Sequence, residues 1–326
     1  VDVAGVLQVG PRGAGAMPGP ACYGLGGTEA TVTDAQMVLG RLRPGLYSGG
    51  GLSLDGDLAE CAVGENVAEK LGISLVDAAA GVIRVAEQRM HHALGQVSIE
   101  RGIDPRGFTL IAAGGAGGLH GAAVGRALGA RQVYVPRLAG VLCALGMLNS
   151  DVRHDYVRTY VRSLDEAEKE EVEGRFDELL EGALEQLVRE GFVEGDMKFE
   201  REMDLRYRDQ QWDVRVRLDD NGLDNRASLR ARFEDAYERL YGHRQPETRV
   251  EIVKLRLTAT GVLTGLPPEA ADPAAGAPEP VETRPVYVDA ATGVTEAPIY
   301  QGGDLAAGHV VDGPLVVEET TTTVFV

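Results

Sequence analysis

Residues 108–121 have the sequence FTLIAAGGAGGLHG, in which an apolar run leads into glycines at positions 114, 115, 117 and 118. A helical pattern of apolar residues follows over 119–128 and ends before Gly129. This order predicts a strand, a glycine-rich turn and a helix. Glycines in such a turn permit positive φ angles and let a ligand approach the main chain, and the helix N-terminus offers N–H groups to polar or anionic atoms. Ligand contact and tight packing of the turn are equally compatible with the pattern.

Motif spacing and composition exclude several classes of protein. The glycines fit neither the GxGxxG dinucleotide fingerprint nor the GxxxxGK[ST] phosphate loop. A net charge of −18 disfavours nucleic acid and anionic membranes as partners, and no segment approaches the roughly 20 apolar residues of a membrane span. Three dispersed cysteines (Cys22, Cys61 and Cys143), with no CxxC pair and no secretory signal pattern, indicate a reducing, cytoplasmic location.

The order of predicted elements indicates two domains in the 326 residues. Strands alternate with helices through residues 1–150, which predicts an α/β domain, and residues 151–326 predict a β-rich α+β domain with two helices. The predicted strands cover 3–9, 109–113, 133–135, 152–161, 203–207, 212–218 and 250–259, with short β runs over 281–326 after a linker at 266–280. The predicted helices cover 74–101 with Ser74 and Asp77 as a capping pair, 119–128, 138–148, 165–190 with Ser163 and Glu166 as a capping box, and 227–241, and a short helix follows Thr33 as its N-cap.

The loop over residues 10–27 is a second unusual element, because its glycines and prolines fix its shape and keep its backbone accessible. Its candidates for contact with substrate or phosphate are Gly19, Cys22, Tyr23 and Gly24. Cys22 could be a nucleophile, but no neighbour in the sequence would activate its thiol, so a buried and inert thiol is favoured. Asp34 is either a carboxylate that faces a ligand, as metal ligand or catalytic base, or a partner of a helix dipole.

Histidines are the other candidates for chemistry. His91 and His92 are adjacent on a predicted helix and point about 100° apart, so they cannot hold one ion together. His120 lies in the first turn after the glycines and could contact a ribose, a base or a phosphate, or be an ordinary residue of a helix start. The sequence leaves any metal ligands unknown.

Six blocks of the sequence together resemble one family. They are GPACYGLGGTEATVTDAQMVLGRL, AAGGAGGLHGAA, VPRLAGVLCALGML, RHDYVRTYV, YGHRQPETRVEIVKLRLTATG and GPLVVEETTTTVFV. In this order they resemble the C-terminal half of the hydantoinase A / 5-oxoprolinase family, whose members include N-methylhydantoinase A-like proteins. The chain also begins without Met and stops within an apolar run, so we expect a piece of a longer polypeptide or a processed subunit.

The resemblance implies an actin-like, Hsp70-type ATPase fold in which ATP lies between two lobes. Residues 1–150 would form part of the lobe on the adenosine side. Gly114, Gly115, Ala116 and Gly117 match the family's adenosine-side glycine motif and His120 the histidine that follows it. The phosphate-binding hairpins would lie N-terminal to Val1.

The implied activity is ATP- and Mg²⁺-dependent activation of an amide carbonyl by phosphorylation, followed by hydrolytic opening of a cyclic amide such as a hydantoin or 5-oxoproline. Family members work with a hydantoinase B-like subunit or domain, so an oligomer is expected. Two alternatives remain: a subunit of an ATP-dependent ketone carboxylase of the acetone or acetophenone type, and an assembly module that is not catalytic by itself.

The chain departs from the family pattern at three positions. It has Met17 where the family usually has Asp, Gly118 where it has Pro, and Gln36 where it has Asn. The first change removes a carboxylate from the loop over residues 10–27 and puts an acid–base role of that loop in doubt.

Overall fold

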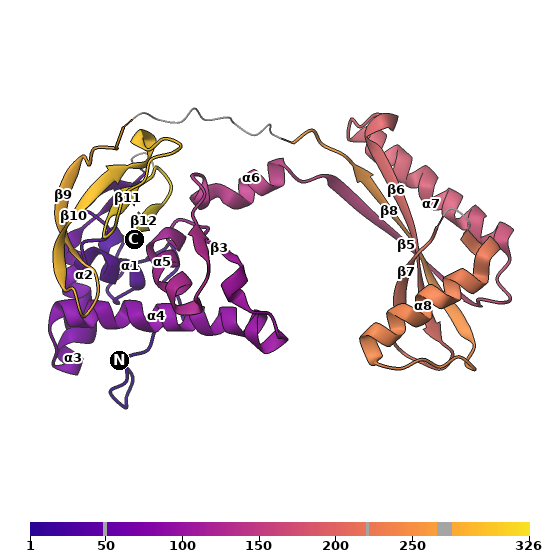
Figure 1. The fold of residues 1–326 in the computed structure, drawn as a ribbon, viewed down its shortest axis with the longest axis horizontal. Helices are drawn as coiled ribbons and strands as arrows, with labels where there is room; N and C mark the ends of the chain where they lie inside the picture. The colour runs from indigo at the N-terminus through magenta and orange to yellow at the C-terminus, as the bar shows by residue number, and fades with distance from the viewer. Residues whose placement is uncertain (48–50, 220–221, 266–275) are drawn as a thin grey trace. The chain divides into compact units, whose positions relative to one another are not determined.

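A computed structural model describes residues 1–47, 51–219, 222–265 and 276–326 (Figure 1). The chain divides into two compact units. Unit 1 combines Val1–Gly146 with the C-terminal segment Pro268–Val326, and unit 2 comprises Met147–Pro267. In the parts of the chain that are described, no helix has the length and apolar character needed to cross a bilayer.

Unit 1 is built from helices around short sheets. Its helices are α1 Val32–Val38, α2 Gly56–Val63, α3 Glu69–Leu71, α4 Leu75–Val97, α5 Gly117–Leu128 and α6 Leu142–Leu148, which ends just beyond the boundary of the unit. A π-helical turn, Gly64–Ala68, joins α2 to α3, and 3-10 turns lie at Ala21–Tyr23, Ile99–Arg101, Pro105–Gly107, Ala139–Val141 and Gly302–Asp304. Ser74 caps α4, as predicted: its hydroxyl oxygen accepts a hydrogen bond from the N–H of Asp77 at 3.1 Å.

The strands of unit 1 form three small sheets. They are the antiparallel pair β1 Gly45–Tyr47 and β2 Leu52–Leu54, the parallel pair β3 Thr109–Ile111 and β4 Gln132–Tyr134, and a four-stranded sheet of β9 Glu282–Tyr287, β10 Val294–Gln301, β11 Val316–Glu318 and β12 Thr323–Phe325 in the order β12-β11-β10-β9. In this last sheet β10 and β11 run parallel and the other pairs antiparallel. The predicted strand, glycine turn and helix thus become β3, the turn after it and α5.

The C-terminal sheet belongs to unit 1 because it closes the core around α1 and α5. Leu119 of α5 packs with Val286, Ile299 and Val316 of that sheet. The buried Arg41, just after α1, donates hydrogen bonds to the carbonyls of Tyr287 and Val288 in or just after β9. The two compact units therefore differ from the predicted division into 1–150 and 151–326. The described residues from 276 onward belong to unit 1.

Unit 2 is a two-layer α+β arrangement. It contains β5 Val152–Ser163, α7 Lys169–Arg189, β6 Met197–Tyr207, β7 Val214–Arg217, α8 Arg226–Tyr241 and β8 Val250–Gly261, with 3-10 turns at Glu194–Asp196 and Gly222–Asn225. The antiparallel sheet has the order β5-β8-β6-β7. One core joins Phe176 of α7, Phe233 of α8 and Tyr207 of β6, so both helices pack against the sheet and the other face carries ion pairs such as Arg256–Asp204.

Most predicted elements are confirmed, and four local predictions are wrong. Residues 3–9 form turns and irregular backbone in place of the predicted strand. The N-cap of α1 is Thr31, not Thr33, because Asp34 closes a capping box with Thr31. The N-cap of α7 is Glu168, without a side-chain bond, in place of the Ser163–Glu166 box. The predicted helix over 74–101 ends at Val97 and continues only as a 3-10 turn. Most of the predicted linker at 266–280 lies outside the described residues.

Candidate functional site

The turn between β3 and α5 is held in a bent shape with part of its backbone bare. Gly114 has a φ of +88°, which favours glycine, and its N–H donates to the carbonyl of Ala139 at 2.7 Å. The next residue, Gly115, has room above its Cα: a Cβ there would meet only the carbonyl oxygen of Thr321, at 3.4 Å. Ala116 is the N-cap of α5 and makes no side-chain capping bond. The helix therefore begins at an accessible stretch of main chain.

The other glycines of the motif serve packing. A Cβ on Gly117 would lie 3.3 Å from the carbonyl carbon of Ala112, and a Cβ on Gly118 would lie 2.6 Å from the carbonyl oxygen of Thr323. The contact at Gly118 is short enough to force a shift of the backbone, and the one at Gly117 would require its neighbour to move by a few tenths of an ångström, so both positions favour glycine where α5 crosses β3 and β12. The two interpretations of the glycine run thus apply to different residues: Gly115 is free to face a ligand, while Gly117 and Gly118 permit close packing.

A pocket of about 260 Å³ lies beside this turn and is the candidate functional site. It is hereafter called the glycine-turn pocket. Four threonines of the segment before and within β12 form one side of it, and Thr322 donates a hydrogen bond to the carbonyl of Gly115 at 3.0 Å. The described residues that line it are Tyr23, Val32, Thr33, Gln36, Leu42, Leu52, Leu54, Gly115, Ala116, Leu119, His120, Glu319, Thr320, Thr321, Thr322 and Thr323.

His120 faces this pocket from the first turn of α5 and is almost fully buried. Its Nδ1 lies 3.2 Å from Oε1 of Glu87 in α4, and its Nε2 lies 3.4 Å from Nε2 of Gln36 in α1. A chain of three polar side chains therefore connects α4, α5 and α1 at the wall of the pocket. Such a chain fixes the orientation of the imidazole.

Asp34 lies on the inner side of α1 and is fully buried. Its two oxygens accept hydrogen bonds from the N–H of Cys22 at 2.8 Å and from the N–H and hydroxyl of Thr31 at 2.9 and 2.7 Å, and the N–H of Ala21 lies at 3.4 Å. These contacts use the carboxylate to tie the loop over residues 10–27 to the start of α1. They support a structural role and give no support to the predicted role as metal ligand or base.

The candidates of the loop over residues 10–27 have different positions. Tyr23 lines the glycine-turn pocket, whereas Cys22 is fully buried behind it. Gly19 and Gly24 have φ angles of +75° and +67° and shape the loop.

Burial raises the pKa of the Cys22 thiol, as do its side-chain hydrogen bond to Asp34 and the charge of that carboxylate. The structure thus supports the inert thiol.

This burial predicts the order in which the thiols react. We expect Ellman's reagent at pH 8 to modify two thiols of the native chain, those of the exposed Cys61 and Cys143, and to reach Cys22 only after unfolding. Peptide mapping of the modified protein identifies the sites. Rapid modification of Cys22 in the folded chain would contradict the assignment and restore it as a candidate nucleophile.

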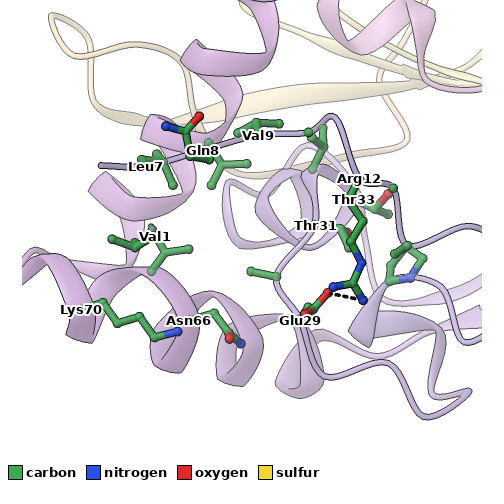
Figure 2. Close-up of a pocket in the computed structure, with 18 of the residues that line it drawn as sticks. Val1, Leu7, Gln8, Val9, Arg12, Glu29, Thr31, Thr33, Asn66 and Lys70 are labelled. Carbon is green, nitrogen blue, oxygen red and sulfur yellow. Dashed lines mark ion pairs between the residues drawn. The ribbon is translucent and has the colours of Figure 1, made fainter. Parts of the chain in front are cut away.

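A second pocket, of about 590 Å³, is lined in part by residues of the same loop (Figure 2). Figure 2 shows Arg12 directed toward Glu29, with which it forms an ion pair at 3.6 Å, and Lys70 and Asn66 on the neighbouring helical segment. Thr33 lines both pockets. The start of α1 therefore separates two cavities, of which only the first touches the glycine turn.

Sequence reasoning missed part of the site. Glu87 lies in the middle of a long amphipathic helix, where nothing in the pattern distinguishes it, and Gln36 was noted only as a departure from the family. The run of four threonines at 320–323 was a usable signal, because consecutive hydroxyl side chains within a matched block are unusual. Among the described residues, no three His, Cys, Asp or Glu side chains come together as metal ligands.

Comparison with known proteins identifies the chain's relatives. The alpha subunit of a caprolactamase from Pseudomonas jessenii is 38 % identical over 100 % of this chain and 48 % of its own length. The solved structure of that ATP-dependent caprolactamase matches with a TM-score of 0.75 and 36 % identity, over 100 % of this chain and 48 % of its own. The gamma subunit of an acetophenone carboxylase from Aromatoleum aromaticum is 34 % identical, over 100 % of this chain and 46 % of its own length.

The fold and the family follow from these matches. This chain spans about half the length of the caprolactamase and acetophenone carboxylase subunits. Two family models match nearly all of it: hydantoinase/oxoprolinase over residues 1–156, and the hydantoinase/oxoprolinase C-terminal domain over residues 162–326. The mixed α/β structure that the sequence predicts is confirmed, and the chain belongs to the hydantoinase/oxoprolinase family.

Proposed function

We propose that this chain is part of an ATP-dependent enzyme that opens a cyclic amide, and that its glycine-turn pocket holds the nucleoside part of ATP. When bound, ATP supplies the phosphoryl group that activates the amide carbonyl for attack by water. The observation that carries the proposal is the pocket beside the bare backbone of Gly115, which belongs to the block that resembles an adenosine-side motif.

The lining of the pocket fits a nucleoside. Leucine side chains at one side can pack against a base, and the threonine hydroxyls at the other can bind the hydroxyls of a ribose. A volume of about 260 Å³ suits a group of that size. Among the described lining residues, Glu319 is the one carboxylate and neither Lys nor Arg occurs. The donors needed for the phosphates and for Mg²⁺ would therefore come from other parts of the enzyme.

An apolar face of unit 1 supports the view that more of the fold packs on this chain. Parallel sheets in proteins are covered on both faces, yet only one face of the β3–β4 pair packs on α5. The opposite face leaves Ile111 and Tyr134 exposed, with Phe108 exposed next to it. We propose that the half of the family's length that this chain does not span covers this face and brings the phosphate-binding hairpins. The actin-like assignment of the lobe rests on this proposal.

A ketone carboxylase is the second candidate, and the similarity to the acetophenone carboxylase gamma subunit favours it. In either case the relatives are subunits of larger enzymes, so a hydantoinase B-like partner and an oligomer are part of the proposal.

ATP turnover with two sets of substrates separates the two candidates. We expect the full-length protein with its partner to form ADP when given a lactam such as ε-caprolactam, 5-oxoproline or hydantoin, and to release the ring-opened amino acid. ADP formation that requires both a ketone and bicarbonate would favour the carboxylase. Turnover with neither set would contradict the proposed activity.

A further inference from the structure

The amide nitrogen of Gln36 has a polar neighbour, whereas its amide oxygen has no hydrogen-bond partner in the part of the chain that the structure describes. Gln36 lines the glycine-turn pocket and is 1 % exposed. Its Nε2 lies 3.4 Å from Nε2 of His120, and its Oε1 is buried with no hydrogen-bond partner among the described residues. Buried polar atoms in folded proteins are nearly always paired. An orphaned amide oxygen at the wall of a pocket therefore calls for a partner from outside the protein.

The polarity of the chain from Glu87 to Gln36 explains why the oxygen is the free atom. A carboxylate only accepts hydrogen bonds, so Nδ1 of His120 carries the hydrogen that is shared with Glu87. The tautomer with its hydrogen on Nδ1 has a lone pair on Nε2, which accepts an N–H of Gln36. This contact fixes which way the amide faces. The Gln36 oxygen is thereby offered as an acceptor, and Glu87 and His120 act as positioning residues.

We propose that Gln36 is a specificity-determining residue of the glycine-turn pocket, where its side-chain oxygen accepts a hydrogen bond from an N–H or O–H group of the bound ligand. This inference rests on the proposed function, because it takes the ligand to be a reactant of the ATP-dependent reaction. Two reactants carry such a donor: the nucleotide, through its exocyclic amine or ribose hydroxyls, and the cyclic amide, through its N–H.

Pairs of ligands that differ in one donor test the proposal in the full-length protein. The pairs are ATP with purine riboside triphosphate, which has a hydrogen in place of the exocyclic amine, ATP with its 2′-deoxy and 3′-deoxy forms, and ε-caprolactam with ε-caprolactone, which has an oxygen in place of the N–H. Affinities come from calorimetry for the nucleotides and from competitive inhibition for the lactone. Gln36→Met keeps the length of the side chain and removes the acceptor. Gln96→Met is the matched control, since Gln96 is exposed near the end of α4 and lies outside the pocket.

We expect the wild type and Gln96→Met to prefer the donor-bearing member of one pair by about tenfold, the size of one hydrogen bond. In Gln36→Met this preference is lost, so that the two members of that pair bind with about equal affinity, and the other pairs are unchanged. The pair that responds identifies which ligand group donates the hydrogen bond. A preference that stays within twofold of wild type for every pair would overturn the inference. Should Gln36→Met fail to fold, as judged by circular dichroism, Gln36→Leu, which also removes the acceptor, replaces it and is held to the same two outcomes.

Failure of this inference can be told apart from failure of the proposed function. If Gly115→Val weakens ligand binding while Gln36→Met leaves every preference intact, the pocket stands and the role of Gln36 is rejected. If Gly115→Val has no effect on any ligand, the pocket itself is rejected and the inference with it.

Discussion

Replacement of Asp34 by alanine is expected to lower the free energy of unfolding by about 3 kcal/mol or more. The carboxylate is fully buried. It accepts hydrogen bonds from the N–H of Cys22 and from both the N–H and the hydroxyl of Thr31, at 2.7 to 2.9 Å. Alanine would leave these donors in a space that water reaches poorly. An unpaired buried donor keeps its full cost of desolvation, so the loss exceeds that of an ordinary hydrogen bond.

Urea denaturation of three variants checks this expectation. Asparagine has the same shape as aspartate but turns an N–H₂ group toward donors. The free energy of unfolding of Asp34→Asn should therefore lie between those of the wild type and Asp34→Ala. Asp57→Ala is the matched control: Asp57 is exposed in the first turn of α2, and its loss should change the free energy by no more than about 0.5 kcal/mol. A loss below about 1 kcal/mol for Asp34→Ala would show that the loop is not held by this carboxylate.

The local signals in the sequence predicted the elements well. The strand, glycine turn and helix around residue 114 follow from short-range chemistry, as do the cap at Ser74 and the end of α8 at Gly242. In each case the residues that decide the structure lie within a few positions of one another. The choice of Thr31 over Thr33 as N-cap is also a local signal, because Thr31 and Asp34 have the three-residue spacing of a capping box.

Contacts between distant segments could not be predicted in this way. The return of the C-terminal sheet to unit 1 depends on Arg41, which binds carbonyls about 246 positions further along. Which glycines serve packing and which one leaves its backbone open depends on contacts with Ala112 and Thr323. These contacts exist only in the folded chain. Asp34 is a carboxylate of the kind that catalysis uses, but the partners that it has in the fold support a structural role.

The second large expected effect is on nucleotide binding by Gly115→Val. The φ of Gly115 is outside the left-handed region, so the backbone accepts a side chain. A Cβ would lie in open space 3.4 Å from the Thr321 carbonyl oxygen, and the methyl groups of valine would occupy part of a pocket of only about 260 Å³. We expect the fold to persist and the affinity for ATP to fall by about 100-fold, or about 2.7 kcal/mol.

Gly95→Val is the matched control for this change. Gly95 lies in α4, away from the pocket, and a Cβ there would meet no heavy atom within 4 Å. The same substitution therefore adds the same side chain to a helix that does not line the site. Thermal unfolding of both variants shows whether each is folded at the temperature of the binding measurement.

Titration calorimetry of ATP into the full-length wild type, Gly115→Val and Gly95→Val tests the nucleotide site most directly. The account predicts equal affinity for the wild type and Gly95→Val and about 100-fold weaker binding by Gly115→Val. Unchanged ATP affinity in a folded Gly115→Val protein would contradict it, because a nucleoside cannot lie against that turn when a valine fills the space.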